Sequence, residues 1–504
     1  MRGKIKVVSF VLCAVFMLGL ASTVNAQINW NVSSNPNQVT QYGVTELMGR
    51  VRLQAAAPGT TVGSTITITY QGVTIKNTAA TGITLGGTAS GTVAISQVVP
   101  STGTGGQVIL AVTGGTGLVA DELTIDGVRA DVSTLALATD VQASLSSTSS
   151  TANTFVNVSV VRVATVNKAL DVAMTASSSV FCLNPNNPTI TLTEGFSGAF
   201  VQYVTSAAGS VPSSANPTAA RVKYGANRNI RVSIVVSTLP TDTTLTWPVT
   251  VPIDIDGAGP GTATSSLELV AQSASGDNAL YEFTTTDQGV SDQFAEVFAV
   301  TPTLVFNPDT SEPGSTTAQA RLEPQDTPTS TEVPRFNHPY IPPATTFFTV
   351  NKCTTNLLFT FVTNATGVGF DSGIAIANTS QDPYGTAPQH GTITAYFYGT
   401  NAPAPLTSAD VPAGSVWANS LSTIAPGFQG YIIAIAQFQY AHGYAFITGK
   451  YNAGSVYDVA EGYVAVVIPD PTFTPLAGVA HRYAGPPPQN NIAIPPSSGE
   501  QLGQ

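Results

Sequence analysis

Charged side chains are scarce in this sequence. Asp, Glu, Lys and Arg together make up 9% of 504 residues, against about 25% in an ordinary soluble protein. The usual helix formers Leu, Lys and Glu are sparse, while Thr, Val, Ser, Ala and Gly dominate, and the 45 Gly and 34 Pro residues follow no Gly-X-Y period. These shortages exclude coiled coils, helical bundles, helical repeats and collagen, and they indicate a β protein with many turns.

Long apolar runs are also lacking, apart from one at the N-terminus. Three cations among the first six residues precede an apolar run over 7–20, and the small residues around Ala26 provide a cleavage site. This pattern predicts a signal peptide over 1–26. No later stretch of 18 apolar residues follows, so we expect no membrane span in the mature chain. The predicted location is extracellular, at the cell surface or in the periplasm.

Basic residues are few in the mature chain. The signal peptide contains three of the 18 Lys and Arg residues and no acid, which leaves 15 basic residues against 29 acidic ones. A nucleic-acid-binding surface needs a basic patch, so nucleic acid is excluded as a partner. Cell-surface glycans or other surface proteins remain as partners, and the oligomeric state is left open.

Alternating runs separated by turns define the fold class. Segments such as 64–70, 154–160 and 392–398 alternate apolar and polar residues, and Gly-rich turns separate such runs. Period two over these lengths predicts half-buried strands. We therefore predict an all-β chain of tandem antiparallel β-sandwiches of Ig-like architecture, with the strand topology undetermined.

Proline spacing divides the chain. Eight prolines interrupt residues 307–349, and because proline cannot donate to a sheet ladder, we predict an extended linker there. The expected units are a signal peptide over 1–26, an N-terminal sandwich over 27–178, a second sandwich over 179–306, a Pro-rich linker over 307–349, a C-terminal sandwich over 350–471 and a flexible tail over 472–504.

Only two cysteines remain after the signal peptide. Cys182 and Cys353 are 171 positions apart, which excludes C-x-x-C redox and zinc-ribbon motifs. In an oxidising compartment the two form either a disulfide, which would close a long loop, or two separately buried thiols. The spacing alone leaves both alternatives open.

Motifs that carry chemistry are missing. The four histidines form no ligand pair with metal-binding spacing, and no G-x-S-x-G elbow or Gly-rich phosphate loop occurs. We therefore expect no metal, no cofactor and no catalytic residues. A hydrolase whose site assembles from distant positions, around His390 or His442, stays as a third hypothesis.

Aromatic residues concentrate in the predicted C-terminal sandwich (350–471) and provide the one candidate ligand site. Aromatic rings present large rigid faces on which a sugar can stack. The candidate residues are Tyr396, Tyr398, Trp417 and Tyr444. Aromatics at period two also serve as core residues and cross-strand pairs, so the pattern allows either use.

The predicted C-terminal sandwich also contains a recognisable sequence pattern. Residues 370–380 read FDSGIAIANTS, residues 425–431 read APGFQGY and residues 437–446 read QFQYAHGYAF. This resembles a group of uncharacterised secreted bacterial proteins of acidobacterial type, which have a TGIAIANTS-like segment and a GFQGY…FQYAHGxAF segment. Ser372 stands where that group usually has Thr. The resemblance implies export and a β-rich module, and it assigns no catalytic residue.

Three functions are consistent with these features. The first is an exported, non-enzymatic structural or surface-interaction protein of the adhesion type, which the tandem β organisation favours. The second is a secreted carbohydrate-binding module that uses the aromatic residues of the C-terminal sandwich. The third is the dispersed-site hydrolase.

Overall fold

A computed structural model describes residues 28–468 of the chain with several gaps. The gaps are 57–62, 79–80, 114–120, 149–152, 197–198, 201–202, 205–229, 253–264, 286–294, 296, 328–334, 342–345 and 451–457. The signal peptide expected over 1–26 and the tail expected over 472–504 lie outside the described residues.

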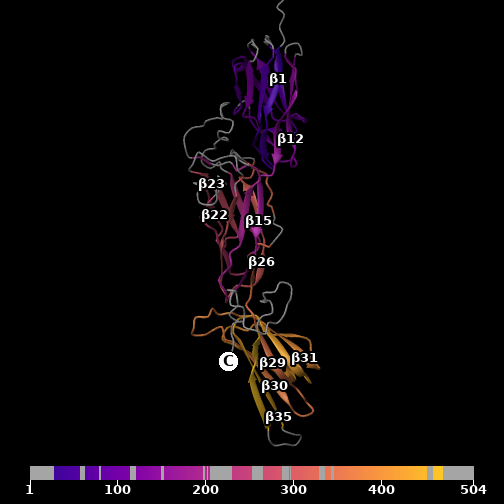
Figure 1. Cartoon of the computed structure of the whole chain (residues 1–504), viewed down its shortest axis with the longest axis vertical. Helices are drawn as coiled ribbons and strands as arrows, with labels where there is room; N and C mark the ends of the chain where they lie inside the picture. Colours follow the sequence, from indigo (N-terminus) through magenta and orange to yellow (C-terminus); the bar gives the residue numbers. More distant parts are fainter. Residues whose placement is uncertain are drawn as a thin grey trace, which may run out of the picture.

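The described chain is all-β and forms three sandwiches that follow one another along the long axis of the molecule (Figure 1). Each has its own cluster of buried apolar side chains. From these clusters we define an N-terminal sandwich (28–168), a middle sandwich (169–353) and a C-terminal sandwich (354–468).

The N-terminal sandwich packs a five-stranded sheet, β13-β1-β4-β10-β7, against a six-stranded sheet, β2-β14-β12-β5-β9-β8, with a small sheet β3-β11-β6 beside them. Its elements are β1 (Ile28–Asn35), β2 (Asn37–Thr40), β3 (Glu46–Leu47), β4 (Arg50–Ala55), β5 (Thr65–Gln71), β6 (Thr74–Ile75), β7 (Thr84–Gly86), the 3-10 turn η1 (Ser90–Thr92), β8 (Val93–Val99), β9 (Gly105–Val112), β10 (Glu122–Asp126), β11 (Arg129–Asp131), β12 (Asp140–Ser147), β13 (Asn153–Phe155) and β14 (Val160–Asn167).

The middle sandwich is built on a sheet β21-β22-β23-β19-β27, with β18 paired to β23, and three smaller sheets, β15-β17-β24, β16-β28-β26 and β20-β25. Its strands are β15 (Leu170–Thr175), β16 (Ser177–Val180), β17 (Thr189–Glu194), β18 (Tyr203–Val204), β19 (Arg231–Val236), β20 (Thr243–Thr246), β21 (Thr250–Pro252), β22 (Ser265–Gln272), β23 (Asn278–Thr285), β24 (Val297–Val300), β25 (Thr303–Phe306), β26 (Gly314–Thr316), β27 (Ala318–Glu323) and β28 (Phe348–Asn351).

The C-terminal sandwich has two sheets, β32-β31-β34-β29-β37 and β33-β30-β35-β36. One chain segment joins them, because β36 passes at Ala465 into β37 of the other sheet. The elements are β29 (Thr355–Thr363), β30 (Asp371–Asn378), β31 (Ile393–Thr400), β32 (Leu406–Thr407), β33 (Val416–Ser420), α2 (Leu421–Ile424), β34 (Gln429–Ala436), β35 (Ala441–Lys450), β36 (Asp458–Val464) and β37 (Val466–Ile468).

Alternation along the strands explains the cores. In β5 the residues Ile66, Ile68 and Tyr70 are fully buried, while the threonines between them are half-exposed. Side chains of a strand point alternately to its two faces, so a period of two places one apolar row inside the sandwich. The prediction of an all-β chain of antiparallel sandwiches is confirmed. Among the described strands, the pairs β1–β13, β2–β14, β16–β28 and β18–β23 are parallel.

The prediction of an extended linker over 307–349 is wrong where this stretch forms strands. β26 and β27 lie within it, and β28 begins in it. In β27 the residues Ala318, Ala320 and Leu322 are fully buried, and β27 pairs with β19 along its length. The eight prolines of 307–349 lie outside these strands in the sequence, so they remove no ladder donors from the strand interiors.

The middle sandwich also starts earlier than residue 179 and ends later than residue 306. β15 pairs with β17, and Leu170 belongs to the middle core. At the other end, Val350 and Asn351 pair with β16. Composition changes at Cys182 and at the proline-rich stretch suggested other boundaries, but long-range strand pairing decides where one core ends.

The segment Arg335–Ile341 joins the middle sandwich to the N-terminal one. On the N-terminal side, the Val44 amide donates to the Arg335 carbonyl at 2.8 Å, and the Asn337 amide donates to the Tyr42 carbonyl at 2.8 Å. These bonds pair the segment with a loop that precedes β3. The expected linker therefore contains a backbone contact between two sandwiches.

The same segment is held by the middle sandwich. The Phe336 amide donates to the Pro324 carbonyl at 3.0 Å, and the Ile341 amide donates to the Ala320 carbonyl at 2.9 Å. The Phe336 ring is fully buried in the middle core. We call this contact, residues 335–341 with Tyr42, Gly43 and Val44, the upper junction.

Helices contribute little to the described residues. The α-helix α2 has four residues and the 3-10 turn η1 has three. Within the described part of the chain, no helix has the length and apolar character needed to cross a membrane.

Candidate functional site

Exposed aromatic side chains mark the C-terminal sandwich. Tyr and Phe rings usually lose water on folding, so a cluster of exposed ones indicates a surface for binding. Among the described residues, the exposed large aromatic side chains are Phe361, Tyr384, Tyr398, Tyr431, Tyr444 and Phe446, and all six belong to this sandwich.

The structure separates the predicted aromatic residues. Tyr396 and Tyr398 lie on β31 and alternate with the buried residues Ala395 and Phe397, so they point outward from their sheet. Tyr444 lies on β35, in the other sheet of the sandwich, and points outward on the opposite side of the molecule from Tyr398. The four predicted ligand-binding residues therefore do not form one platform.

Trp417 points the other way. It pairs with the buried Ile376 of β30, and its indole packs against the C-terminal core. A half-buried ring in this position contributes to packing, and it offers little face to a ligand.

Two further rings complete the outer faces. Tyr431 of β34 is stacked on Tyr398, with ring centroids 5.1 Å apart and an interplanar angle of 15°. Phe446 lies two residues beyond Tyr444 on the same face of β35. The signal was available, because Tyr431 and Phe446 both lie at period two in runs predicted to be strands.

A short turn holds Tyr384 away from the sandwich. The Asp382 carboxylate accepts hydrogen bonds from the Thr386 hydroxyl at 2.5 Å and from the Tyr384 amide at 2.8 Å. The hydrogen bond from Thr386, with those from the backbone amides, holds the pKa of Asp382 below its usual value. The turn leaves 90% of Tyr384 exposed.

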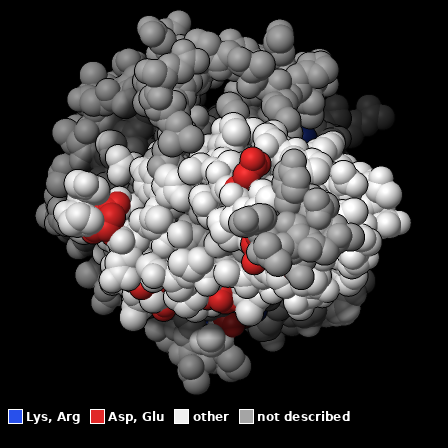
Figure 2. Space-filling model, turned by 90° about the horizontal axis from the view of Figure 1, so that it is seen from below, with Lys and Arg blue, Asp and Glu red and all other residues white. Residues whose placement is uncertain are grey.

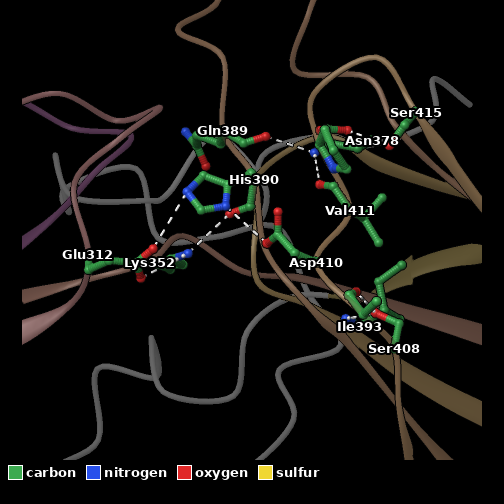
Figure 3. Close-up of polar contacts among 12 residues, drawn as sticks. Glu312, Lys352, Asn378, Gln389, His390, Ile393, Ser408, Asp410, Val411 and Ser415 are labelled. Atoms are coloured by element: carbon green, nitrogen blue, oxygen red, sulfur yellow. Dashed lines mark hydrogen bonds and ion pairs between the residues drawn. The ribbon is translucent and has the colours of Figure 1, made fainter.

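A cluster of titratable side chains lies where the middle and C-terminal sandwiches meet (Figure 3). His390 Nδ1 is 2.9 Å from Asp410 Oδ1, and His390 Nε2 is 3.7 Å from Glu312 Oε1. Lys352 Nζ is 3.3 Å from Glu312 Oε2 and donates to the His390 carbonyl at 3.4 Å. We call these four residues the lower junction.

The lower junction contains the Asp–His pair that a hydrolase would need, but not its third member. In a catalytic triad the far nitrogen of the histidine accepts the proton of a nucleophile. Here the Nε2 atom of His390 faces the carboxylate of Glu312. Among the described residues, no group of three His, Cys, Asp or Glu side chains is placed to hold a metal ion.

Cys182 and Cys353 form a disulfide, with their Cα atoms 6.0 Å apart. Cys182 follows β16, and Cys353 follows β28, the strand that pairs with β16. The bond closes a loop across the middle sandwich. It also lies beside a cleft of about 500 Å³ lined by residues of both sandwiches, among them Phe181, Phe306 and Tyr440.

The C-terminal end of the molecule has little positive charge. Figure 2 shows scattered acidic side chains on a largely uncharged described surface, with almost no basic ones in view. Residues 353–468 contain five acidic residues, Asp371, Asp382, Asp410, Asp458 and Glu461, and one basic residue, Lys450. An anionic partner would therefore find little attraction here.

No protein-family model and no curated protein matches the chain. Among solved structures, the C-terminal domain of the Streptococcus pyogenes antigen I/II-family protein AspA is similar at 10% identity and a TM-score of 0.32, covering 64% of this chain and 99% of that one. The major pilin subunit BcpA of Bacillus cereus gives 9% identity and a TM-score of 0.22, covering 77% and 92%. The collagen adhesin of S. aureus gives 11% and 0.17, covering 65% and 93%. TM-scores this low say nothing about what this chain binds.

Proposed function

We propose that this chain is an exported, non-enzymatic surface-interaction protein of the adhesion type, and that its C-terminal sandwich makes the contact. One observation carries the proposal: the exposed aromatic side chains of the described chain gather on this sandwich alone. Tyr and other aromatic residues are enriched at protein contact surfaces, because a ring supplies large contact area at low entropic cost.

The arrangement of the sandwiches supports this proposal. The C-terminal sandwich lies at one end of an elongated molecule (Figure 1), where a partner can approach it without meeting the other two. The sandwiches are linked by backbone hydrogen bonds at the upper junction. At the lower junction they are linked by the contact of His390 with Glu312 and by the hydrogen bond from Lys352 to the His390 carbonyl. A linked series of this kind would act as a spacer that presents its end.

Export is supported by the disulfide. Disulfides form and persist in oxidising compartments outside the cytosol, and the Cys182–Cys353 bond joins the ends of the paired strands β16 and β28 in the middle sandwich. The lower junction supports a non-enzymatic role, because the His390 ring is held between carboxylates from two sandwiches. The contacts of the His390 ring join the middle sandwich to the C-terminal one.

The test uses the mature chain, residues 27–504, labelled at its N-terminus. Retention of this chain on intact cells of the producing bacterium and on their isolated extracellular matrix is measured. In the test variant, Tyr398, Tyr431, Tyr444 and Phe446 are each changed to Thr. The matched control changes four exposed valines of the other sandwiches, Val156, Val158, Val249 and Val297, to Thr.

We expect the aromatic variant to lose most of its retention and the valine variant to keep it. Equal retention of the two variants would contradict the proposal, and so would the absence of retention for the unmodified chain. Export itself is checked by fractionation of the native cells, in which a cytoplasmic location would contradict it.

A further inference from the structure

The outer face of the sheet β33-β30-β35-β36 contains a shallow groove of about 400 Å³. The groove crosses β33, β30 and β35. It is lined by Gly373, Ile374, Ala375, Ala418, Asn419, Ser420, Tyr444 and Phe446, none of which is charged.

The floor of the groove is flat because its residues are small. Gly373 and Ala375 alternate with the buried residue Ile374, so they face outward. A Cβ atom added at Gly373 would meet no other atom closer than the Phe446 carbonyl oxygen, at 3.9 Å. The space above Gly373 is therefore open to a ligand.

Two aromatic rings form one wall. Tyr444 and Phe446 are 45% and 42% exposed. A Cβ atom on Gly462 of β36 would overlap the Tyr444 hydroxyl and crowd the Phe446 ring. The Tyr444 ring therefore extends over β36 into the space that Gly462 leaves, and nearly half of its surface is exposed.

Hydroxyl groups lie at the other side. Ser420 of β33 is the strand neighbour of Gly373. Its hydroxyl is 2.8 Å from that of Thr423, and the Ser422 hydroxyl donates to it at 3.0 Å. A hydroxyl can both donate and accept, and it turns to suit its partner.

The backbone beneath the groove is already paired. β30 pairs with β33 on one side and β35 on the other, and β35 also pairs with β36. Peptides that bind to sheets usually add a strand through free backbone groups, and such groups lie at sheet edges. Away from the outer edge of β33, a ligand on this face must be recognised by side chains.

We propose that this groove binds a neutral glycan, with one sugar ring laid on Tyr444 and the hydroxyls of a neighbouring sugar of the same glycan bonded at Ser420. A sugar ring has an apolar C–H face that stacks on an aromatic ring, and hydroxyls on its rim that need donors and acceptors. The uncharged lining fits a neutral ligand, and the paired backbone disfavours a peptide. The proposal rests on the proposed function and adds the partner's chemical class.

The experiment measures binding of the mature chain to cellulose, chitin, curdlan and mannan, with heparin and gelatin as a charged glycan and a protein. Two variants change the groove: Gly373→Val fills the floor, and Tyr444→Ala removes the wall. Valine suits a strand interior, and the site is open, so Gly373→Val should fold. Thermal unfolding of each variant checks folding.

Two matched controls leave the groove intact. Val249→Ala removes an exposed apolar side chain from the middle sandwich. Gly367→Val fills another open glycine position in the same sandwich, outside the groove. We expect at least one neutral polysaccharide to bind, and both groove variants to weaken that binding by about tenfold or more, while both controls keep it.

The proposal is overturned if none of the four neutral polysaccharides binds, if folded Gly373→Val binds as well as the unmodified chain, or if binding is limited to heparin or gelatin. The proposed function fails separately. If the aromatic variant loses retention on cells while Gly373→Val keeps it, the C-terminal sandwich makes the contact through another surface, and only the groove proposal is lost.

Discussion

The N-terminal and C-terminal sandwiches are built in the same way and differ on their outer faces. Residues 28–168 contain six basic and six acidic residues. Several form ion pairs across neighbouring strands, among them Arg50–Asp126 at 2.8 Å and Arg52–Glu122 at 2.7 Å, between β4 and β10. Charge is balanced locally, and the outer face is hydrated.

In the C-terminal sandwich the corresponding outward positions hold aromatic and small residues. Tyr398 stacks on Tyr431 on one sheet, and Tyr444 and Phe446 flank the groove on the other. The inward residues of a strand determine the fold, while the outward residues are free to vary. The outward residues of two sandwiches can therefore differ in kind while the inward residues of both keep the apolar alternation that forms a core.

The two junctions also differ, in the kind of contact that forms each of them. The upper junction is made by backbone hydrogen bonds around a buried phenylalanine. The lower junction is made by side-chain contacts, from His390 to the half-exposed Glu312 and from Lys352 to the His390 carbonyl. We therefore expect mutations at the upper junction to have the larger effects on stability.

The largest expected effect comes from Phe336→Ala. The ring is fully buried in the middle core, so its loss should cost about 3–5 kcal/mol of unfolding free energy. Denaturant unfolding measures the cost, and faster trypsin cleavage at Arg335 reports opening of the junction. The control Phe361→Ala removes a ring of the C-terminal sandwich that is 44% exposed. Similar losses of unfolding free energy in the two variants would contradict the expected difference between the buried and the exposed ring.

The second effect depends on pH and involves His338, whose ring packs edge-on against Tyr42 at the upper junction, with centroids 5.2 Å apart. Burial lowers the pKa of His338 to about 4, although a hydrogen bond with the backbone of Pro339 opposes this shift, and the charge of Arg321 adds a smaller lowering. The unfolded chain, with an ordinary histidine pKa near 6.5, binds the proton first.

Stability from His338 is therefore fully present above about pH 6.5 and is lost as the pH falls toward 4. The loss should reach about 3 kcal/mol at most. Unfolding of the His338→Phe variant between pH 7 and pH 4 should show a shallower decline than that of the unmodified chain. His390→Gln at the lower junction is the control and should keep the steep decline; an unchanged slope in His338→Phe would contradict the assignment.

A smaller effect tests the charge balance of the N-terminal sandwich. Arg50→Met keeps the apolar stem and removes the two hydrogen bonds that its Nε donates to Asp126. The pair is about three-quarters buried, so its loss should cost about 1 kcal/mol. High salt should reduce this cost, because exposed charges are screened. A cost independent of salt would indicate packing as its source.

The smallest effect is expected at the lower junction. Glu312→Gln weakens the contacts to Lys352 and His390, and with Glu312 half exposed the loss should stay below about 1 kcal/mol. We expect the angle between the middle and C-terminal sandwiches to vary over a wider range. Small-angle X-ray scattering would show this as a broader distance distribution. Glu268→Gln, an exposed position on β22, is the control. A large loss of stability would contradict the comparison.

Strands were predictable from the sequence because their signal is local. The run 64–70 alternates in sequence, and it alternates between buried and half-exposed in β5. The proline-rich stretch was interpreted wrongly because its proline content was given more weight than its alternation. Its strand β27 alternates as clearly as β5, with Ala318, Ala320 and Leu322 buried, and no proline lies within it.

The candidate site was predictable only as a composition. The sequence identified the C-terminal segment as aromatic, and the structure keeps Tyr398 and Tyr444 outward. The sequence alone could not show that the two rings lie on opposite sheets or that Trp417 turns inward. Nor could it show that Gly373 and Gly462 make room for a groove. Each of these facts depends on which strands are neighbours.

By itself the sequence determined the class of this protein: alternation with period two, scarce charge and frequent turns permit sheets and exclude helical folds. The tertiary structure decided which outward residues share a face, which cysteines and which junction residues meet, and where each sandwich ends. The physical reason is that alternation is a property of a few adjacent residues, whereas strand pairing joins residues far apart in the chain.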